Sequence, residues 1–214
     1  MAIAMGAAAE HVFDLSGGRP CLDFANTVSD RPEAPKERLR AYGDLVAWAR
    51  QSGLLDPARA QELLRQASRH PAEAEAALER ARALRERLFE LFAAAAAGQR
   101  PPAEALAALN AALPAALSHR RLARGSEGGF RWEWDRPAGA LDAMLWPVVH
   151  SAAALLASDE LSALRECAAD SCAWLFLDNS RNHSRRWCDM KVCGNRTKAR
   201  RHYERARREA AKPS

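Results

Sequence analysis

Four of the chain's five cysteines lie within 27 residues, in two equally spaced pairs: Cys167 with Cys172, and Cys188 with Cys193. Four residues separate the cysteines of each pair, and fifteen residues separate the two pairs. Thiolates bind zinc tetrahedrally at about 2.3 Å, and two short loops joined by a returning segment bring four sulfurs together in this way. The spacing therefore predicts one structural zinc ion held by these four side chains.

Other roles for these cysteines are open from the residues alone. A free cysteine is often only a small buried hydrophobic residue, whereas a dithiol redox site needs a two-residue spacing that is absent here. His183, between the pairs, could replace one cysteine as a ligand. Four thiolates close the coordination sphere and leave no position for an activated water, so a catalytic zinc is disfavoured.

Cations gather around and after the second cysteine pair. Residues 181–214 contain twelve of the 32 Lys and Arg residues but only three acidic residues, whereas the whole chain has a net charge of +5. A zinc ion with four thiolates carries a formal charge of −2, which Arg165, Arg186, Lys191 and Arg196 are placed to offset. The rest of this charge favours a polyanionic partner, because clustered cations release counterions from phosphates.

The segment 197–210 is expected to be a helix with Asn195 as its N-cap. Its narrow apolar seam of Ala199, Tyr203, Ala206 and Ala210 is expected to dock on the zinc-binding loops. Arginine binds phosphates and guanine edges through two-point contacts, although a charge run can also be a solvated face. The candidate DNA-binding residues are Arg185, Arg186, Lys191, Arg196, Lys198, Arg200, Arg201 and Arg205. The alternative is a protein-interaction module in which this helix docks on an acidic partner.

The elements that position this site are expected to be mainly helical, because the chain is rich in Ala, Leu and Arg. Apolar periodicity together with Pro and Gly signals predicts helices near 20–28, 42–52, 57–69, 71–97, 101–114 and 141–157. Pro147 either kinks the last of these or marks its start. Alternation around "GSEGG" predicts a β-hairpin with Phe130, Trp132 and Trp134 spaced by two, and residues 174–177 form a short apolar strand.

We therefore predict a mainly α (α+β) protein with two parts: residues 1–158, a helical domain with a small β-hairpin, and residues 159–214, a four-cysteine zinc module that ends in a basic helix. No membrane span or secretory signal is visible, so a cytoplasmic protein is expected. No carboxylate pair, Ser-His-Asp pattern or phosphate-binding glycine loop indicates an enzyme. A small-molecule pocket is one interpretation of Asp23, Asn26, Thr27 and Arg31, but capping and buried hydrogen bonding are favoured.

Two stretches resemble known families. The segment "RECAADSCAWLFLDNSRNHSRRWCDMKVCGNRTKARRHYERAR" resembles the CGNR zinc finger, named for the tetrapeptide at residues 193–196. The stretch "LSGGRPCLDFANTVSDR" and the helix containing Trp146-Pro147 resemble the ABATE domain of stress-induced transcription regulators. The resemblance implies a bacterial regulator whose four cysteines hold zinc, whose finger binds DNA through Arg196, Lys198 and Arg200, and whose N-terminal domain senses a ligand or signal. A homodimer and association with the nucleoid are compatible with that role.

Overall fold

The computed structural model describes residues 12–125, 128–137 and 139–210. Six helices precede the zinc module, and a seventh follows it. The helices are α1 (Pro20–Ala25), α2 (Tyr42–Gln51), α3 (Pro57–Arg69), α4 (Pro71–Ala96), α5 (Ala103–Ser118), α6 (Leu145–Leu156) and α7 (Asn195–Ala210). The antiparallel strand pairs are β1 (Val28–Ser29) with β2 (Lys36–Glu37), β3 (Arg120–Arg124) with β4 (Phe130–Trp134), and β5 (Leu164–Glu166) with β6 (Leu175–Leu177). This architecture confirms the predicted fold class.

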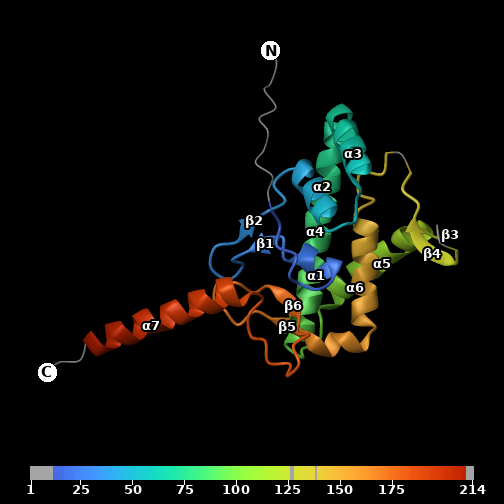
Figure 1. The fold of residues 1–214 in the computed structure, drawn as a ribbon. Helices are drawn as coiled ribbons and strands as arrows, with labels where there is room; N and C mark the ends of the chain where they lie inside the picture. Colours follow the sequence, from blue (N-terminus) through green and yellow to red (C-terminus); the bar gives the residue numbers. More distant parts are fainter. Residues whose placement is uncertain (1–11, 126–127, 138, 211–214) are drawn as a thin grey trace, which may run out of the picture.

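The long helix α4 lies at the centre of the body, with α1 and α5 beside it, and α6 packs against α1 and α5 (Figure 1). Its apolar stripe recurs at helical spacing, and Leu78, Leu88 and Phe92 on that stripe are fully buried. Across the core, the rings of Phe24 on α1 and Trp48 on α2 lie 5.0 Å apart. The body thus consists of helices packed around α4, and α1 is one of these helices.

The helices predicted at 42–52, 57–69 and 71–97 are confirmed within one or two residues. The carboxylate of Asp56 accepts from the Arg59 backbone N–H at 2.8 Å, and Pro57 follows at the first helical position. These signals are local, because a cap and a proline act on the neighbouring backbone alone. They can therefore be read from the sequence without knowledge of the tertiary packing.

Two predicted helix ends were wrong. Helix α5 does not end at Pro114 but runs through it to Ser118. A proline inside a helix costs one backbone hydrogen bond, and the burial of Leu109 and Ala116 against neighbouring helices favours a continuous helix. Conversely, α1 ends at Ala25, and Val28 is buried in strand β1 rather than on a helix face.

The predicted hairpin is confirmed as β3 and β4, which pair from Arg120 opposite Trp134 to Arg124 opposite Phe130. It projects from the body on the side opposite to α7 (Figure 1). Helix α6 begins at Leu145, so Pro147 lies in its first turn, where a missing N–H removes no intrahelical bond. Of the two interpretations of Pro147, the structure supports a position at the start of the helix.

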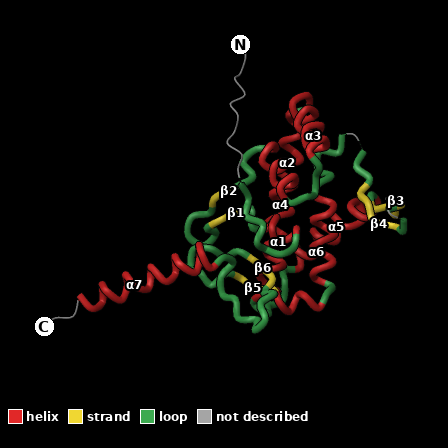
Figure 2. Tube along the Cα trace, in the orientation of Figure 1, coloured by secondary structure: helices red, strands yellow, loops and turns green. Residues whose placement is uncertain are grey.

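Part of the segment that follows α6 packs into the core of the helical body. Leu164, Leu175 and Leu177 on strands β5 and β6 belong to the same buried cluster as α1 and α4, and Figure 2 shows these strands at the lower end of the helical body. The predicted boundary near residue 158 falls between α6 and the 3-10 turn Asp159–Ala163, and it remains a prediction. None of the described helices has both the length and the apolar character needed to cross a bilayer.

Candidate zinc centre and basic helix

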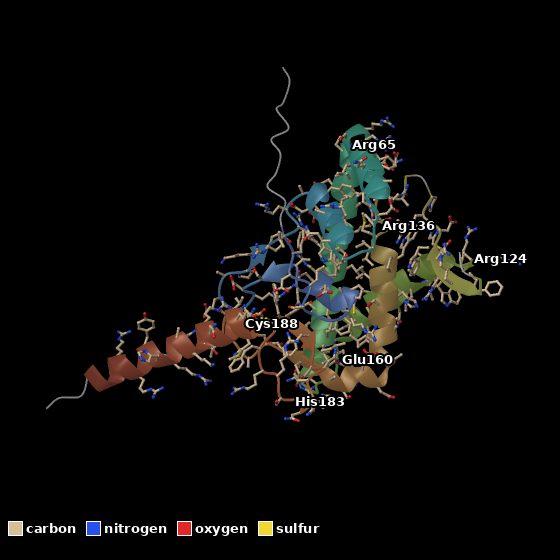
Figure 3. All side chains as sticks on the ribbon, viewed as in Figure 1. Arg65, Arg124, Arg136, Glu160, His183 and Cys188 are labelled. Carbon is tan, nitrogen blue, oxygen red and sulfur yellow. The ribbon has the colours of Figure 1, made fainter. Side chains whose placement is uncertain are left out.

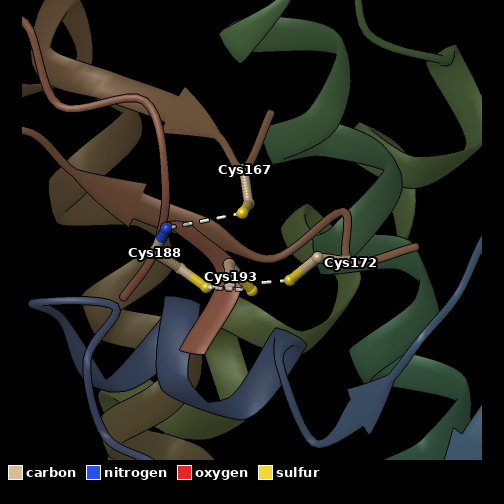
Figure 4. A group of neighbouring side chains, drawn as sticks. All are labelled: Cys167, Cys172, Cys188 and Cys193. Carbon is tan, nitrogen blue, oxygen red and sulfur yellow. Dashed lines mark hydrogen bonds between the residues drawn. The ribbon is translucent and has the colours of Figure 1, made fainter. Parts of the chain in front are cut away.

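Three segments bring the four cysteines of the zinc centre together (Figure 4). Cys167 follows strand β5 and Cys172 precedes strand β6, while Cys188 precedes the turn Met190–Gly194 and Cys193 lies within it. All four side chains are buried, and their Sγ atoms lie within 4.8 Å of one another. The hairpin β5–β6 supplies one pair, and the entry to α7 supplies the other.

The sulfur spacing fits a tetrahedral zinc ion. The Sγ atoms of Cys172 and Cys188 lie 3.7 Å apart, and those of Cys188 and Cys193 lie 3.6 Å apart. Four sulfurs at about 2.3 Å from one zinc ion lie about 3.8 Å from one another. The predicted metal site is therefore confirmed as a four-cysteine group that is able to hold one zinc ion.

The electrostatics of the thiols also favour a bound cation. Hydrogen bonds from Cys172 and Cys188 lower the pKa of Cys167, while burial raises the pKa of Cys193. The protein groups alone thus stabilise one thiolate at the expense of its neighbours. Four adjacent thiolates need a divalent ion to share their charge, and zinc would supply that charge here.

Neighbouring backbone and cationic groups support the sulfurs. The Cys188 backbone N–H points to the Cys167 Sγ at 3.4 Å, and the Arg196 guanidinium lies 3.6 Å from the Cys193 Sγ. Donors to ligand sulfurs fix their orientation and offset their charge. Arg196 therefore has the charge-offsetting position expected from the sequence.

The turn into α7 passes through the Cys-Gly-Asn-Arg tetrapeptide, where a side chain larger than that of glycine would have to displace the flexible Met190 side chain. A Cβ atom at Gly194 would come within 2.5 Å of the Met190 sulfur. The predicted N-cap at Asn195 was wrong, because Asn195 already has helical backbone angles and continues the preceding turn. Asp189 takes the capping role, since its carboxylate accepts from the backbone N–H groups of Lys191 and Val192.

A buried carboxylate organises the loop between the cysteine pairs. Asp178 is fully buried and accepts from the backbone N–H and hydroxyl of Ser180 and from the backbone N–H of Arg185. These bonds, led by that of the Ser180 hydroxyl, lower the pKa of Asp178. Arg185 donates to the carbonyls of Trp187 and Cys188, and its guanidinium lies 4.4 Å from the Phe176 ring centre. Arg185, which was predicted to contact DNA, thus stabilises the loop between the cysteine pairs.

His183 is exposed, and its Nδ1 lies 3.0 Å from the Asp178 carbonyl oxygen. It is not part of the buried cysteine group, and Figure 3 shows it on the loop below the α7 base, apart from Cys188. The interpretation in which His183 replaces a cysteine ligand therefore finds no support. Trp187 is half-buried and packs against the cysteine cluster.

The basic helix α7 projects from the zinc centre into solvent (Figure 1). The prediction that the apolar seam of α7 docks on the zinc-binding loops was wrong for its described side chains, because Ala199 and Tyr203 are exposed. A straight helix anchored at its first turn soon leaves a small module, since each turn rises 5.4 Å. The remaining candidate DNA-binding side chains are all exposed: Arg186, Lys191, Arg196, Lys198, Arg200, Arg201 and Arg205.

Two of these arginines also pair with acidic groups near the base of α7. Arg196 lies 3.5 Å from the carboxylate of Asp30, and Arg200 lies 3.5 Å from that of Glu33 and 3.3 Å from that of Asp170. Asp30 and Glu33 are in the loop between β1 and β2. No local signal marked these acidic residues, because their partners lie about 170 positions away in the chain.

The candidate ligand cluster on and after α1 consists of residues engaged with the protein itself. Asp23 accepts from the Gly17 N–H at 2.8 Å. Asn26 donates to the Leu175 carbonyl and accepts from its N–H, while Thr27 donates to the Phe24 carbonyl. Arg31 binds Glu86 and the Ala25 carbonyl, and it stacks on Phe89. These bonds support the structural interpretation that the sequence favoured.

A buried four-cysteine centre that anchors an exposed basic helix defines a zinc-finger protein with a helical N-terminal domain. Residues 18–159 match the family model ABATE, described as "Putative stress-induced transcription regulator", and residues 163–206 match the CGNR zinc finger. The chain therefore belongs to the ABATE family, with the CGNR finger following the family domain in the predicted order. Both families are of regulatory or zinc-finger type. None of the curated proteins matches the chain.

Proposed function

We propose that this protein is a DNA-binding transcription regulator in which zinc orients α7 and an N-terminal domain responds to a small effector. The observation that carries the proposal is the direction of α7, whose first turn is tied to the zinc centre while its cationic side chains face solvent. The zinc ion supplies rigidity, and phosphate contacts supply most of the affinity. Such a regulator would act in the bacterial cytoplasm on the nucleoid.

The test is fluorescence anisotropy of a labelled random duplex with the zinc-loaded full chain at several salt concentrations. We expect the affinity to fall at least tenfold between about 50 mM and about 200 mM salt, because each neutralised phosphate adds about 0.9 to the log–log slope. The double variant Arg200→Ala with Arg201→Ala should bind more weakly and lower that slope by about one to two. A salt-independent affinity would contradict phosphate-driven binding.

A matched control separates local contacts from net charge. Arg65→Ala with Arg69→Ala removes the same charge from α3, and Figure 3 shows Arg65 at the end of the body remote from α7. This pair should reduce affinity far less than the α7 pair. Equal losses would show that only the total charge matters and that α7 has no special role.

A second function is favoured by one feature of the α7 region. Met190, Val192 and Tyr203 are 46%, 59% and 75% exposed, and apolar side chains among cations are typical of a protein interface. In this alternative α7 docks on an acidic protein, and the finger is only architectural. The α7 double variant would then keep its DNA affinity and lose capture of that partner.

A further inference from the structure

The N-terminal domain has a cavity of about 430 Å³ beside helix α6. The hairpin contributes Arg120 and Trp134, and α6 contributes Pro147, His150, Ser151 and Leu155. Arg19, Pro20, Ser158 and Glu160 complete the wall from the α1 entry and from the segment that leads to the finger. A cavity of this size accommodates a small organic molecule.

The side chain of Arg120 is the unusual group in this cavity. Its guanidinium lies 4.7 Å from the Trp132 ring centre and 5.5 Å from that of Trp134. The Nε atom is buried without a hydrogen-bond partner, and no carboxylate or carbonyl within the described chain accepts from this guanidinium. The terminal Nη atoms are not among the buried ones and have no acceptor in the described chain either, so the site favours a ligand that accepts from them.

The other polar groups leave Arg120 as the one uncompensated charge among the lining residues. Arg19 and Glu160 form an ion pair with each other. His150 contacts the edge of Trp134 at 5.9 Å between ring centres, and burial together with the Arg120 charge lowers its pKa. The imidazole is therefore neutral at neutral pH, and the cavity wall carries a net charge of about one positive unit.

We infer that this cavity binds a small organic monocarboxylate whose carboxylate pairs with the Arg120 guanidinium. The planar guanidinium matches a carboxylate in two-point fashion. Trp134, Pro147 and Leu155 provide an apolar wall for the body of the molecule. A single positive charge between apolar surfaces suits a monoanion better than a strongly hydrated phosphate.

A larger cavity, of about 540 Å³ between α4, α5 and α6, is a weaker candidate. Its two arginines already have acidic partners, because Arg80 binds Asp142 and Arg87 binds Glu90. An apolar cavity with satisfied rim charges offers no polar anchor that fixes a ligand. The Arg120 cavity is distinguished by a guanidinium that has no acceptor among the described residues.

The position of the Arg120 cavity also suggests how a ligand could affect the finger. Glu160 lies in the 3-10 turn that leads through β5 to Cys167, and its partner Arg19 immediately precedes α1. A ligand against this ion pair would contact both sides of the predicted domain boundary. This regulatory consequence rests on the proposed function, whereas ligand binding does not.

The experiment is isothermal titration calorimetry of the zinc-loaded full chain, without DNA, against paired probes. The acids are hexanoate, benzoate and indole-3-acetate, and each is compared with its neutral amide. We expect at least one acid to bind with a Kd below about 1 mM and its amide to bind at least about tenfold more weakly, because the charge-assisted bond to Arg120 is lost. The absence of heat for all three acids up to about 10 mM would overturn the inference.

Three variants locate the binding. Arg120→Gln should weaken the acid by about tenfold or more, and Ala154→Leu should weaken it by filling the cavity next to Leu155. The control is Arg121→Gln, because this neighbouring arginine is exposed and pairs with Asp135 outside the cavity. Unchanged binding in both cavity variants, or equal loss in the control, would contradict this site. Because no DNA is present, failure here leaves the DNA-binding proposal untouched.

Discussion

At the scale of single residues, burial of the Asp23 carboxyl makes the stability of the fold depend on pH. Asp23 is only 9% exposed, and it accepts from the Gly17 backbone. Desolvation by burial raises the pKa of Asp23 to about 6, against its ordinary 3.8. The folded chain therefore binds this proton more tightly than the unfolded chain does.

The sign of this shift predicts that Asp23 destabilises the fold as pH rises. Below pH 4 the carboxyl is protonated in both states, whereas between about pH 4 and about pH 6 only the folded state retains the proton, so the free energy of unfolding falls by about 3 kcal/mol. The variant Asp23→Asn keeps an acceptor for Gly17 and lacks this titration. Urea unfolding should show similar stability of both proteins near pH 4 and a more stable variant at pH 7.5. Parallel pH profiles would contradict the prediction.

At the scale of elements, the finger is joined to the segments that flank α1 by hydrogen bonds of side chains and backbone groups. Asn26 exchanges two bonds with the Leu175 backbone, and the Leu177 N–H donates to the Gly17 carbonyl. The Trp174 indole N–H donates to the Val28 carbonyl at 3.1 Å. These contacts fix strand β6, and with it the first cysteine pair, relative to the helical body.

Replacing Asn26 by alanine should weaken this joint. The change leaves a buried N–H and a buried carbonyl of Leu175 without partners, so we expect a loss of about 2–4 kcal/mol in the free energy of unfolding. Denaturant titration measures the loss. The control is Asn110→Ala on the exposed face of α5, for which a change within about 0.5 kcal/mol is expected. Similar small losses in both variants would show that the joint contributes little.

A further prediction concerns the acidic loop at the base of α7. Asp30 and Glu33 pair with Arg196 and Arg200, so they compete with phosphates for two candidate DNA-binding arginines. Because exposed pairs are worth about 0.2–1 kcal/mol each, Asp30→Asn with Glu33→Gln should raise DNA affinity about two- to tenfold. Anisotropy measures the change against a control with the same charge, Glu73→Gln with Glu75→Gln on α4. An equal gain in both would show only the effect of net charge.

At the scale of the whole molecule, the finger shares one core with the helical domain but depends on its own metal centre. Leu164, Leu175 and Leu177 are buried in the main core, whereas the cysteines form a smaller separate cluster with Phe176 and Ala169. A cluster this small cannot offset the ordering entropy of its loops without the metal. The helical body has a much larger apolar core of its own.

Zinc removal should therefore unfold the finger and leave the helical body folded. After treatment with a strong chelator, hydrogen exchange should accelerate in residues 167–194, while α4 keeps its protection. DNA binding should be lost in parallel, because the orientation of α7 depends on the metal site. Re-addition of zinc is the control and should restore both. Uniform loss of protection through α4 would show instead that the metal supports the entire fold.

Much of the fold and the zinc centre could be predicted because their signals are local or depend on composition. The spacing of Cys167, Cys172, Cys188 and Cys193 identified the metal group, and caps such as Asp56 marked helix starts. The end of α5 beyond Pro114 and the short length of α1 depended on packing against other helices, which no local pattern contains. The cavity at Arg120 joins residues from four separate segments, so no local pattern pointed to it. The only pocket that the sequence raised was the local cluster from Asp23 to Arg31, for which capping and buried hydrogen bonding were favoured.

The sequence by itself determined the zinc ligands, the helical character and the charge of α7, because coordination chemistry, helix propensity and charge depend on residue type and short spacing. Only the tertiary structure decided that α7 projects into solvent, that Asp30 and Glu33 pair with it, and that the Arg120 guanidinium lines a cavity without an acceptor among the described residues. The physical reason is that hydrogen bonds, ion pairs and desolvation depend on distances in space. Those distances are set by how the whole chain packs.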